Sequence, residues 1–211
     1  MPITVRNQLR PWVPPAFRSA YHKLSRTPQE LFAGHSELFI EALVGCAHYG
    51  EYGAGLSTIY VLEHTEASVV SIETDPTWVD NVRAEVGSDP RLAIKYQDVG
   101  PVGSFGTPLS FAHRSHFPEY ARSLWRSHDN YDVILIDGRF RISCFAACYL
   151  HARAGTKIVF DDYVDRERYH VVEELLAPTT VGNRQALFTV PLVKNIDTAE
   201  EFLEEFKLVW L

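Results

Sequence analysis

The segment from residue 47 to residue 75 constrains the fold most strongly, because it has the pattern of a strand, a glycine turn, a helix and a second strand. Gly53 and Gly55 form the turn, where glycine adopts backbone angles that other residues avoid and leaves no Cβ between backbone and ligand. Glu73 ends the second strand, 20 residues after Gly53. Nucleotide-binding βαβ units place a ribose-binding carboxylate at this distance. The segment therefore predicts a site for an adenosine-containing cofactor.

The residues around the turn distinguish two classes of cofactor. A dinucleotide-binding turn has a third glycine, in the pattern Gly-x-Gly-x-x-Gly, so that the start of the helix can bind a pyrophosphate. Here the third position is Thr58. Glu51, two residues before the turn, would repel a diphosphate but attract an ammonium and a sulfonium. These residues favour S-adenosylmethionine over NAD, and an NAD-dependent oxidoreductase is the third-ranked alternative.

The same residues resemble the first two motifs of class I S-adenosylmethionine-dependent methyltransferases, which read acid-x-Gly-x-Gly and a strand ending in an acid. The resemblance extends from about residue 49 to about residue 190, and residues 134–141 are most similar to an uncharacterised subgroup of methyltransferase-like proteins. It implies that Glu73 accepts the ribose hydroxyls, that Glu51 and the glycine turn hold the methionine end, and that Asp98 lies near the adenine. The implied cofactor-binding residues are Glu51, Tyr52, Gly53, Gly55, Ser57, Glu73, Thr74, Asp98 and Asp137.

Strand-like and helix-like segments alternate along the chain, which predicts an α/β fold. We expect a doubly wound, mostly parallel sheet of about seven strands with an antiparallel edge hairpin and helices on both faces, the Rossmann-like methyltransferase fold. The expected strands are residues 47–52, 68–73, 91–96, 131–136, 156–160, 179–181 and 186–190. The expected helices are residues 56–63, 76–86, 117–125, 140–151, 166–176 and 198–206, with an earlier helix starting at a capping box at residue 27.

The length of 211 residues suits one α/β domain. We assign residues 1–26 to a basic N-terminal extension and residues 27–211 to a single domain that binds S-adenosylmethionine. Residues 99–130 form an unusually long connection between strands, rich first in glycine and proline and then in aromatic residues. Long connections in compact domains often act as lids. We interpret this one as a lid over the methyl acceptor.

The composition argues against several classes of protein. Hydrophobic residues make up 46% of the chain and charged residues 22%, as is usual in globular proteins. We see neither an apolar run of about 18 residues, as a bilayer crossing needs, nor the apolar core of a signal peptide. We therefore expect a cytoplasmic protein. The three cysteines fit neither a disulfide framework nor the spacing of a zinc site.

The net charge of -7 is unevenly distributed, because five basic residues precede the first acid, Glu30. The rest of the chain has 15 basic residues (20 minus 5) against 27 acidic ones, which should repel nucleic acid. For the basic extension, packing on this acidic body is favoured over peripheral contact with an anionic membrane. The expected partner is a small-molecule substrate, and the sequence leaves a homodimer open.

Carboxylates at the ends of the fourth and fifth strands are the candidate catalytic residues: Asp137, Asp161 and Asp162. A distant resemblance to catechol-type O-methyltransferases would make them magnesium ligands. Those enzymes have a lysine base three residues after the first acid, where this chain has Phe140, so magnesium is not favoured. In the favoured interpretation, Asp137 faces the cofactor ammonium or the acceptor, while Asp161 or Asp162 acts as a base or caps the following helix.

Arginines follow both of these strands, and guanidinium groups match carboxylates and phosphates. Arg139, Arg141 and Tyr163 are the candidate substrate-binding residues. Alternatively, the arginines pair with neighbouring acids and hold the loops. The sequence thus predicts methyl transfer to a small molecule, which is anionic if the arginines bind it. The alternative function is a non-catalytic S-adenosylmethionine-binding or scaffold protein, in which the lid would block the acceptor entrance.

Overall fold

The computed structural model describes residues 28–126, 128 and 130–210, with the backbone alone for residues 28–30. The predicted basic extension and the helix cap at Thr27 lie outside this part of the chain. The described part begins with a 3-10 segment, η2 (Pro28–Gly34), followed by α3 (Glu37–Ala42). Residues 31–33 leave the helical conformation, so the helix expected from residue 27 is divided before α3.

Seven strands form the central sheet: β1 (His48–Tyr52), β2 (Ser68–Glu73), β3 (Leu92–Tyr96), β4 (Val133–Ile136), β5 (Lys157–Phe160), β6 (Thr180–Val181) and β7 (Ala186–Thr189). Their order is β3-β2-β1-β4-β5-β7-β6. The pairs among β1 to β5 are parallel, whereas β7 runs antiparallel to both β5 and β6. The predicted doubly wound sheet with an antiparallel edge hairpin is confirmed.

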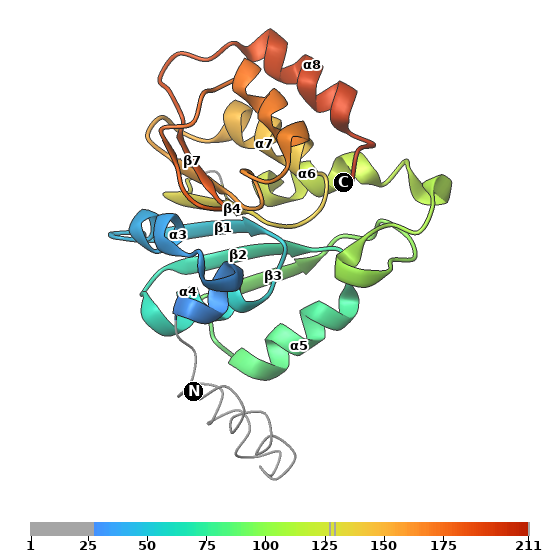
Figure 1. Ribbon diagram of the computed structural model, residues 1–211. Coiled ribbons are helices and arrows are strands. Elements are labelled where there is room, and N and C mark those ends of the chain that lie inside the picture. The colour runs from blue at the N-terminus through green and yellow to red at the C-terminus, as the bar shows by residue number, and fades with distance from the viewer. Residues whose placement is uncertain (1–27, 127, 129, 211) are drawn as a thin grey trace.

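The main helices are α4 (Leu56–His64), α5 (Pro76–Val86), α6 (Phe117–Ser123), α7 (Arg141–His151) and α8 (Ile196–Phe206). Figure 1 shows α4 and α5 on one face of the sheet and α6, α7 and α8 on the other. The connection after β5 contains a 3-10 helix, η6 (Glu167–Glu174). Within the described residues, none of the helices has the length and apolar character that a bilayer crossing requires.

Side chains alternate along β4 and divide the core into two layers. Val133 and Leu135 pack in a cluster with residues of α3 and α4, whereas Ile134 and Ile136 pack with residues of α6 and α7. Because helices bury both faces, a ligand must approach at the ends of the strands. The strand order reverses between β1 and β4, which is where open α/β sheets bind ligands.

The predicted lid, residues 99–130, has two different halves. Its first half contains the 3-10 segments η3 (Ser104–Gly106) and η4 (Phe111–His113), where Phe105 is 77% exposed. Its second half contains α6 and η5 (Leu124–Arg126), and their residues Phe117, Tyr120 and Leu124 are buried in the core. The segment that could act as a lid is therefore the first half.

Candidate functional site

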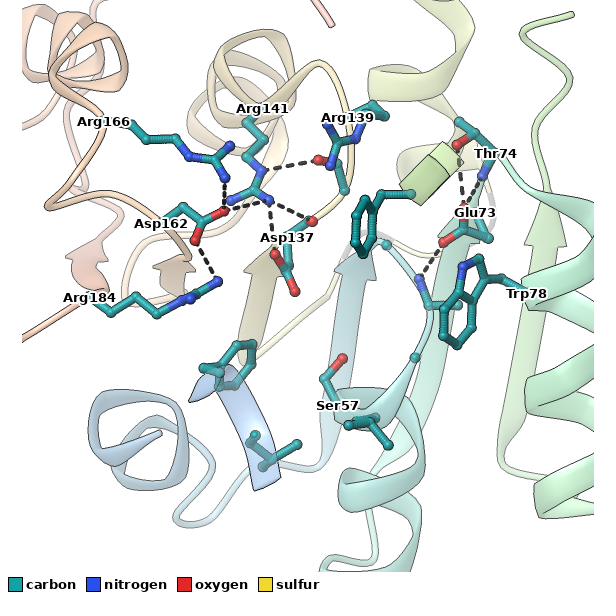
Figure 2. A pocket seen from close by; sticks show the side chains of 18 residues that line it. Ser57, Glu73, Thr74, Trp78, Asp137, Arg139, Arg141, Asp162, Arg166 and Arg184 are labelled. Atoms are coloured by element: carbon teal, nitrogen blue, oxygen red, sulfur yellow. Dashed lines mark hydrogen bonds and ion pairs between the residues drawn. The ribbon is translucent and has the colours of Figure 1, made fainter. Parts of the chain in front are cut away.

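A cavity of about 510 Å³ opens at the carboxyl ends of β1, β2, β4 and β5 (Figure 2). Its volume falls in the usual range for small-molecule sites. Fourteen residues were candidates from the sequence, and nine of them line this cavity: Gly53, Gly55, Ser57, Glu73, Thr74, Asp137, Arg139, Arg141 and Asp162. The other five lie elsewhere: Glu51, Tyr52, Asp98, Asp161 and Tyr163.

The glycine turn after β1 lies against the end of β4. Gly53 has a φ of 98°, and a Cβ on it would come within 2.8 Å of the Gly138 nitrogen, so the two backbones can approach only if residue 53 is glycine. A Cβ on Gly55 would meet nothing within 4 Å. The turn therefore packs closely on one side and leaves open space for a ligand on the other.

The Glu73 carboxylate ends β2 and is fixed by backbone amides. Its Oε1 accepts from the amides of Thr74 (2.7 Å) and Asp75 (2.9 Å), and its Oε2 accepts from the amide of Ala54 (2.8 Å). Burial raises the pKa of Glu73, and the three amides act in the opposite direction. A carboxylate oxygen can accept two hydrogen bonds, so Oε2 can still accept one from a ribose hydroxyl.

Glu51 lies behind the glycine turn and does not face the cavity. It is fully buried, and its carboxylate accepts hydrogen bonds from the hydroxyls of Tyr49 (2.8 Å), Ser57 (2.8 Å) and Thr58. Burial raises its pKa. The position differs from the expected contact with the cofactor ammonium, because the hydroxyls at the start of α4 turn the carboxylate inward. Glu51 thus connects β1 to α4.

Tyr52 and Asp98 also lie away from the cavity. The Tyr52 hydroxyl donates to the carbonyl of Ala121 (2.5 Å), which fixes α6 on the sheet. Asp98 accepts a hydrogen bond from the amide of Gly100 (2.8 Å), which lowers its pKa, and lies 3.4 Å from His116 Nδ1. Asp98 therefore stabilises the first turn of the long connection and does not line the cavity, and its place near an adenine stays a prediction.

Tyr163, a predicted substrate-binding residue, is buried and does not line the cavity. Its hydroxyl donates to Glu173 Oε1 (2.6 Å), and its ring packs against Phe160 and Phe188. These contacts hold η6 against the edge of the sheet.

The exposed half of the long connection is fastened to the end of β2. Thr74 Oγ1 donates to the carbonyl of Gly106 (2.9 Å). Gly106 has a φ of 68°, and a Cβ on it would lie 3.1 Å from Glu73 Oε1, so this backbone can lie on the carboxylate only with glycine at that position. Phe105, the residue before Gly106, lines the cavity. Whether this segment opens and closes stays a prediction.

Arg141 is the centre of an ionic network at the ends of β4 and β5. Its buried guanidinium donates to the carbonyls of Gly138 (3.0 Å), Asp137 (2.9 Å) and Asp161 (2.5 Å). It also binds the Asp137 carboxylate (2.9 Å) and lies 3.3 Å from Asp162 Oδ2 (Figure 2). Arg141 therefore holds the two loops together.

Two further arginines complete this network. Arg184, from the turn between β6 and β7, binds Asp161 through Nε (2.9 Å) and NH2 (2.7 Å), and its NH2 also contacts Asp162. Arg166 lies 2.7 Å from Asp162 Oδ2. Asp161, predicted as catalytic, is fully buried behind the cavity and is bound there by Arg184. The sequence alternative, in which the arginines after the two strands pair with acids, therefore describes Arg141 and Arg166.

Asp137 is the most exposed of the three aspartates. Its side chain is 32% exposed, against 13% for Asp162 and 0% for Asp161. Burial raises the pKa of Asp137 to about 7, the charge of Arg141 opposes this, and Asp161 adds to the increase. The pKa of Asp137 therefore lies above that of an ordinary aspartate.

Replacing Asp137 by asparagine should remove a pH-dependent part of the stability. The native pKa of about 7 lies above the unfolded value of about 3.9. The contribution is therefore fully present below the unfolded pKa and is lost as the pH rises through about 7. Urea unfolding from pH 4 to pH 9 should show the free energy of unfolding of the native protein falling relative to that of Asp137→Asn. A difference that does not vary with pH would contradict this assignment.

Comparison with known proteins agrees with this geometry. The solved structure of a methyltransferase-like protein from Silicibacter pomeroyi is 30% identical in sequence, has a TM-score of 0.75, and covers 88% of this chain and 96% of that one. The chain belongs to the class I S-adenosylmethionine-dependent methyltransferase superfamily. The N-methyltransferase NodS from Bradyrhizobium japonicum, solved with S-adenosylhomocysteine, shares the fold at 14% identity with a TM-score of 0.53, covering 80% and 91% of the two chains. No protein-family model matches the chain, and a search of curated proteins finds no relative.

Nine of the eighteen cavity residues of this methyltransferase superfamily member were not selected from the sequence, and Trp78, Phe105 and Arg184 are among them. Trp78 lies in the first turn of α5, five residues after Glu73. This short spacing from the strand-end acid could have placed Trp78 at the cavity from the sequence. Phe105 is in an irregular segment, and Arg184 is in a hairpin turn. The sequence around each of them has no periodic pattern that would predict where the side chain points.

The three aspartates bring one ligand atom each within 4.8 Å of one another, the arrangement that the magnesium interpretation requires. Arg141, Arg166 and Arg184, however, already bind these carboxylates and balance their three negative charges. A divalent cation would have to displace guanidinium groups and would face their repulsion. The residues present therefore fit a magnesium site poorly.

Proposed function

We propose that the protein transfers a methyl group from S-adenosylmethionine to a small molecule that carries an anionic group. The observation that carries this proposal is the Glu73 carboxylate, fixed by amides at the edge of a cavity and beside the open surface of Gly55. A carboxylate with a free acceptor position suits a hydroxyl of a ribose. When bound, S-adenosylmethionine supplies the methyl group that its sulfonium releases to the acceptor.

The chain's own residues have distinct roles in this proposal. Glu73 binds the ribose, Trp78 provides an aromatic surface for the adenine, and the turn at Gly55 accommodates the methionine end. Asp137, at the end of β4, is the carboxyl group in the cavity that can take a proton from an acceptor hydroxyl or amine. Arg141, Arg166 and Arg184 orient Asp137 and the loops around it.

The same turn fits a dinucleotide poorly. The amide of Ala54 donates to Glu73, and the amide of Gly55 donates to Thr58 Oγ1 (2.9 Å). A pyrophosphate at the start of α4 would need such amides as donors. Because both amides have partners within the chain, an NAD-dependent oxidoreductase is disfavoured.

Isothermal titration with S-adenosylmethionine, S-adenosylhomocysteine and NAD tests the proposed cofactor. We expect micromolar or tighter binding of the two sulfur compounds and no heat from NAD. Tight binding of NAD alone would overturn the proposal. Transfer of labelled methyl from S-adenosylmethionine into a metabolite extract then distinguishes an enzyme from the alternative, a non-catalytic S-adenosylmethionine-binding protein, which would bind the cofactor and label nothing.

Trp78→Ala should weaken binding of S-adenosylhomocysteine about tenfold or more. Stacking of a base on an aromatic side chain contributes about 1–3 kcal/mol, and the Trp78 side chain lines the cavity while it remains 40% exposed. Trp78→Phe keeps an aromatic surface and should retain most of the affinity. If titration calorimetry shows that Trp78→Ala and the native protein bind S-adenosylhomocysteine with equal affinity, Trp78 does not contact the adenine.

A further inference from the structure

Four arginines line the cavity near the ends of β4 and β5, and three of them are neutralised. Arg141, Arg166 and Arg184 pair with Asp137, Asp161 and Asp162, so that three guanidinium groups meet three carboxylates. The fourth, Arg139, has no carboxylate within ion-pair distance among the residues that the structure describes. Figure 2 shows it beside the network, with no interaction drawn to it.

The surroundings of Arg139 make its lack of a partner costly. Its Nε is buried and has no hydrogen-bond partner within the described part of the chain. Burial and the nearby positive charge of Arg141 lower its pKa. The Arg139 side chain is otherwise half-buried, and an unpaired charge that has lost part of its hydration is stabilised by a counter-ion. A guanidinium that stays in such a position is suited to an anion that arrives with a ligand.

The backbone explains why Arg139 and Arg141 have different partners although they are two residues apart. Phe140, between them, has a φ of 53°, in the left-handed region that bulky residues rarely adopt. Its ring is buried against Phe117 (5.1 Å between centroids) and Tyr120 (5.6 Å). This conformation lets Arg141 reach the ends of β4 and β5 while Arg139 stays outside their ionic network. Strained residues of this kind often occur at ligand sites.

We propose that Arg139 binds a carboxylate or phosphate group of the methyl acceptor. This proposal rests on the proposed function and specifies the class of its substrate. Arg139 lines the cavity, and a guanidinium can donate two parallel hydrogen bonds to either anion. The charge balance at the ends of β4 and β5 supports it, because the three aspartates there cancel the three paired arginines and leave Arg139 without a counter-charge. Glu73, the other carboxylate that lines the cavity, lies at the end of β2 and is held by backbone amides. A cationic sulfonium cofactor would add to the positive charge of Arg139, so an anionic acceptor is favoured over a neutral one.

Nitrogen-15 NMR of the protein saturated with S-adenosylhomocysteine can test this directly through the Nε–H signal of Arg139. Inorganic phosphate and benzoate are titrated at constant ionic strength, with neutral benzamide as a third probe. We expect a saturable shift of the Arg139 signal with phosphate, benzoate or both, and none with benzamide. If neither anion shifts the signal, the proposal is overturned.

Two variants separate the role of Arg139 from general charge effects. Arg139→Gln should weaken anion binding about tenfold or more, followed through the backbone amide of Gly138, which lines the same cavity. Arg168→Gln removes an exposed arginine near Arg166 and should leave anion binding unchanged. Equal anion binding by Arg139→Gln and the native protein, with normal thermal melting of both, would overturn the proposal.

The carboxylate of the cofactor's own methionine is the rival partner of Arg139, and calorimetry distinguishes it. 5′-Methylthioadenosine lacks that carboxylate, whereas S-adenosylhomocysteine has it. We expect Arg139→Gln to bind both with native affinity. A tenfold loss for S-adenosylhomocysteine alone would assign Arg139 to the cofactor and overturn the acceptor proposal. If the native protein binds neither compound, the proposed function fails, while the NMR titration without cofactor still reports on Arg139.

Discussion

Glu73→Ala should weaken binding of S-adenosylhomocysteine about tenfold to hundredfold. A hydrogen bond to a charged group contributes about 1.5–3 kcal/mol, and Glu73 Oε2 has one free acceptor position for a ribose hydroxyl. The variant also releases the amides of Ala54, Thr74 and Asp75, so the glycine turn loses its attachment to the end of β2. Titration calorimetry on the folded variant measures the loss.

Two further variants show whether such a loss comes from the ribose contact. Glu73→Gln keeps the shape and one carbonyl oxygen, so its affinity should lie between those of the native protein and Glu73→Ala. Asp75→Ala removes a nearby acid that caps α5 through the amide of Thr77 (2.8 Å). It should cost about 1 kcal/mol of stability and leave the affinity unchanged. If Glu73→Ala binds S-adenosylhomocysteine normally, the cofactor site has been placed wrongly.

The sequence predicted the fold well because its evidence is local. The glycine turn and the alternation of strands and helices depend on neighbouring residues, and β1 and β2 end at the predicted residues, Tyr52 and Glu73. The parallel order then brings the ends of β1, β2, β4 and β5 to one cavity. Glu73, Asp137 and Arg139 could be placed at this cavity from the sequence because each follows directly from the end of a strand.

Other residues could not be placed because their positions depend on distant partners. Glu51 turns inward because Ser57 and Thr58 offer hydroxyls to it. The Ser-Thr pair after the glycine turn was a signal, but its direction depends on how α4 packs. Arg184, 23 residues later in the chain, holds the Asp161 carboxylate away from the cavity. This ion pair forms only because β7 of the edge hairpin pairs with β5. Strand-end position therefore predicts the region of a side chain, and its partners decide whether it faces the cavity.

Arg141→Ala should lower the free energy of unfolding by about 3–5 kcal/mol, whereas Arg139→Gln should change it by less than about 1 kcal/mol. The sequence analysis predicts that both arginines bind the substrate, but only Arg141 is buried with carbonyl and carboxylate partners. Its removal leaves the carbonyls of Gly138 and Asp161 and the Asp137 carboxylate without their donor. Urea unfolding at constant pH measures both differences.

Arg141→Lys tests whether the cause is charge or geometry. A lysine keeps the positive charge but cannot donate in a planar fork to three carbonyls and two carboxylates, so its stability should lie between those of Arg141→Ala and the native protein. Native stability of Arg141→Lys would mean that charge alone holds the loops. Native stability of Arg141→Ala would mean that the network contributes nothing to folding. Because Arg141 fixes the carbonyl and carboxylate of Asp137, we also expect loss of Arg141 to disturb the position of the carboxyl group proposed to take the acceptor's proton.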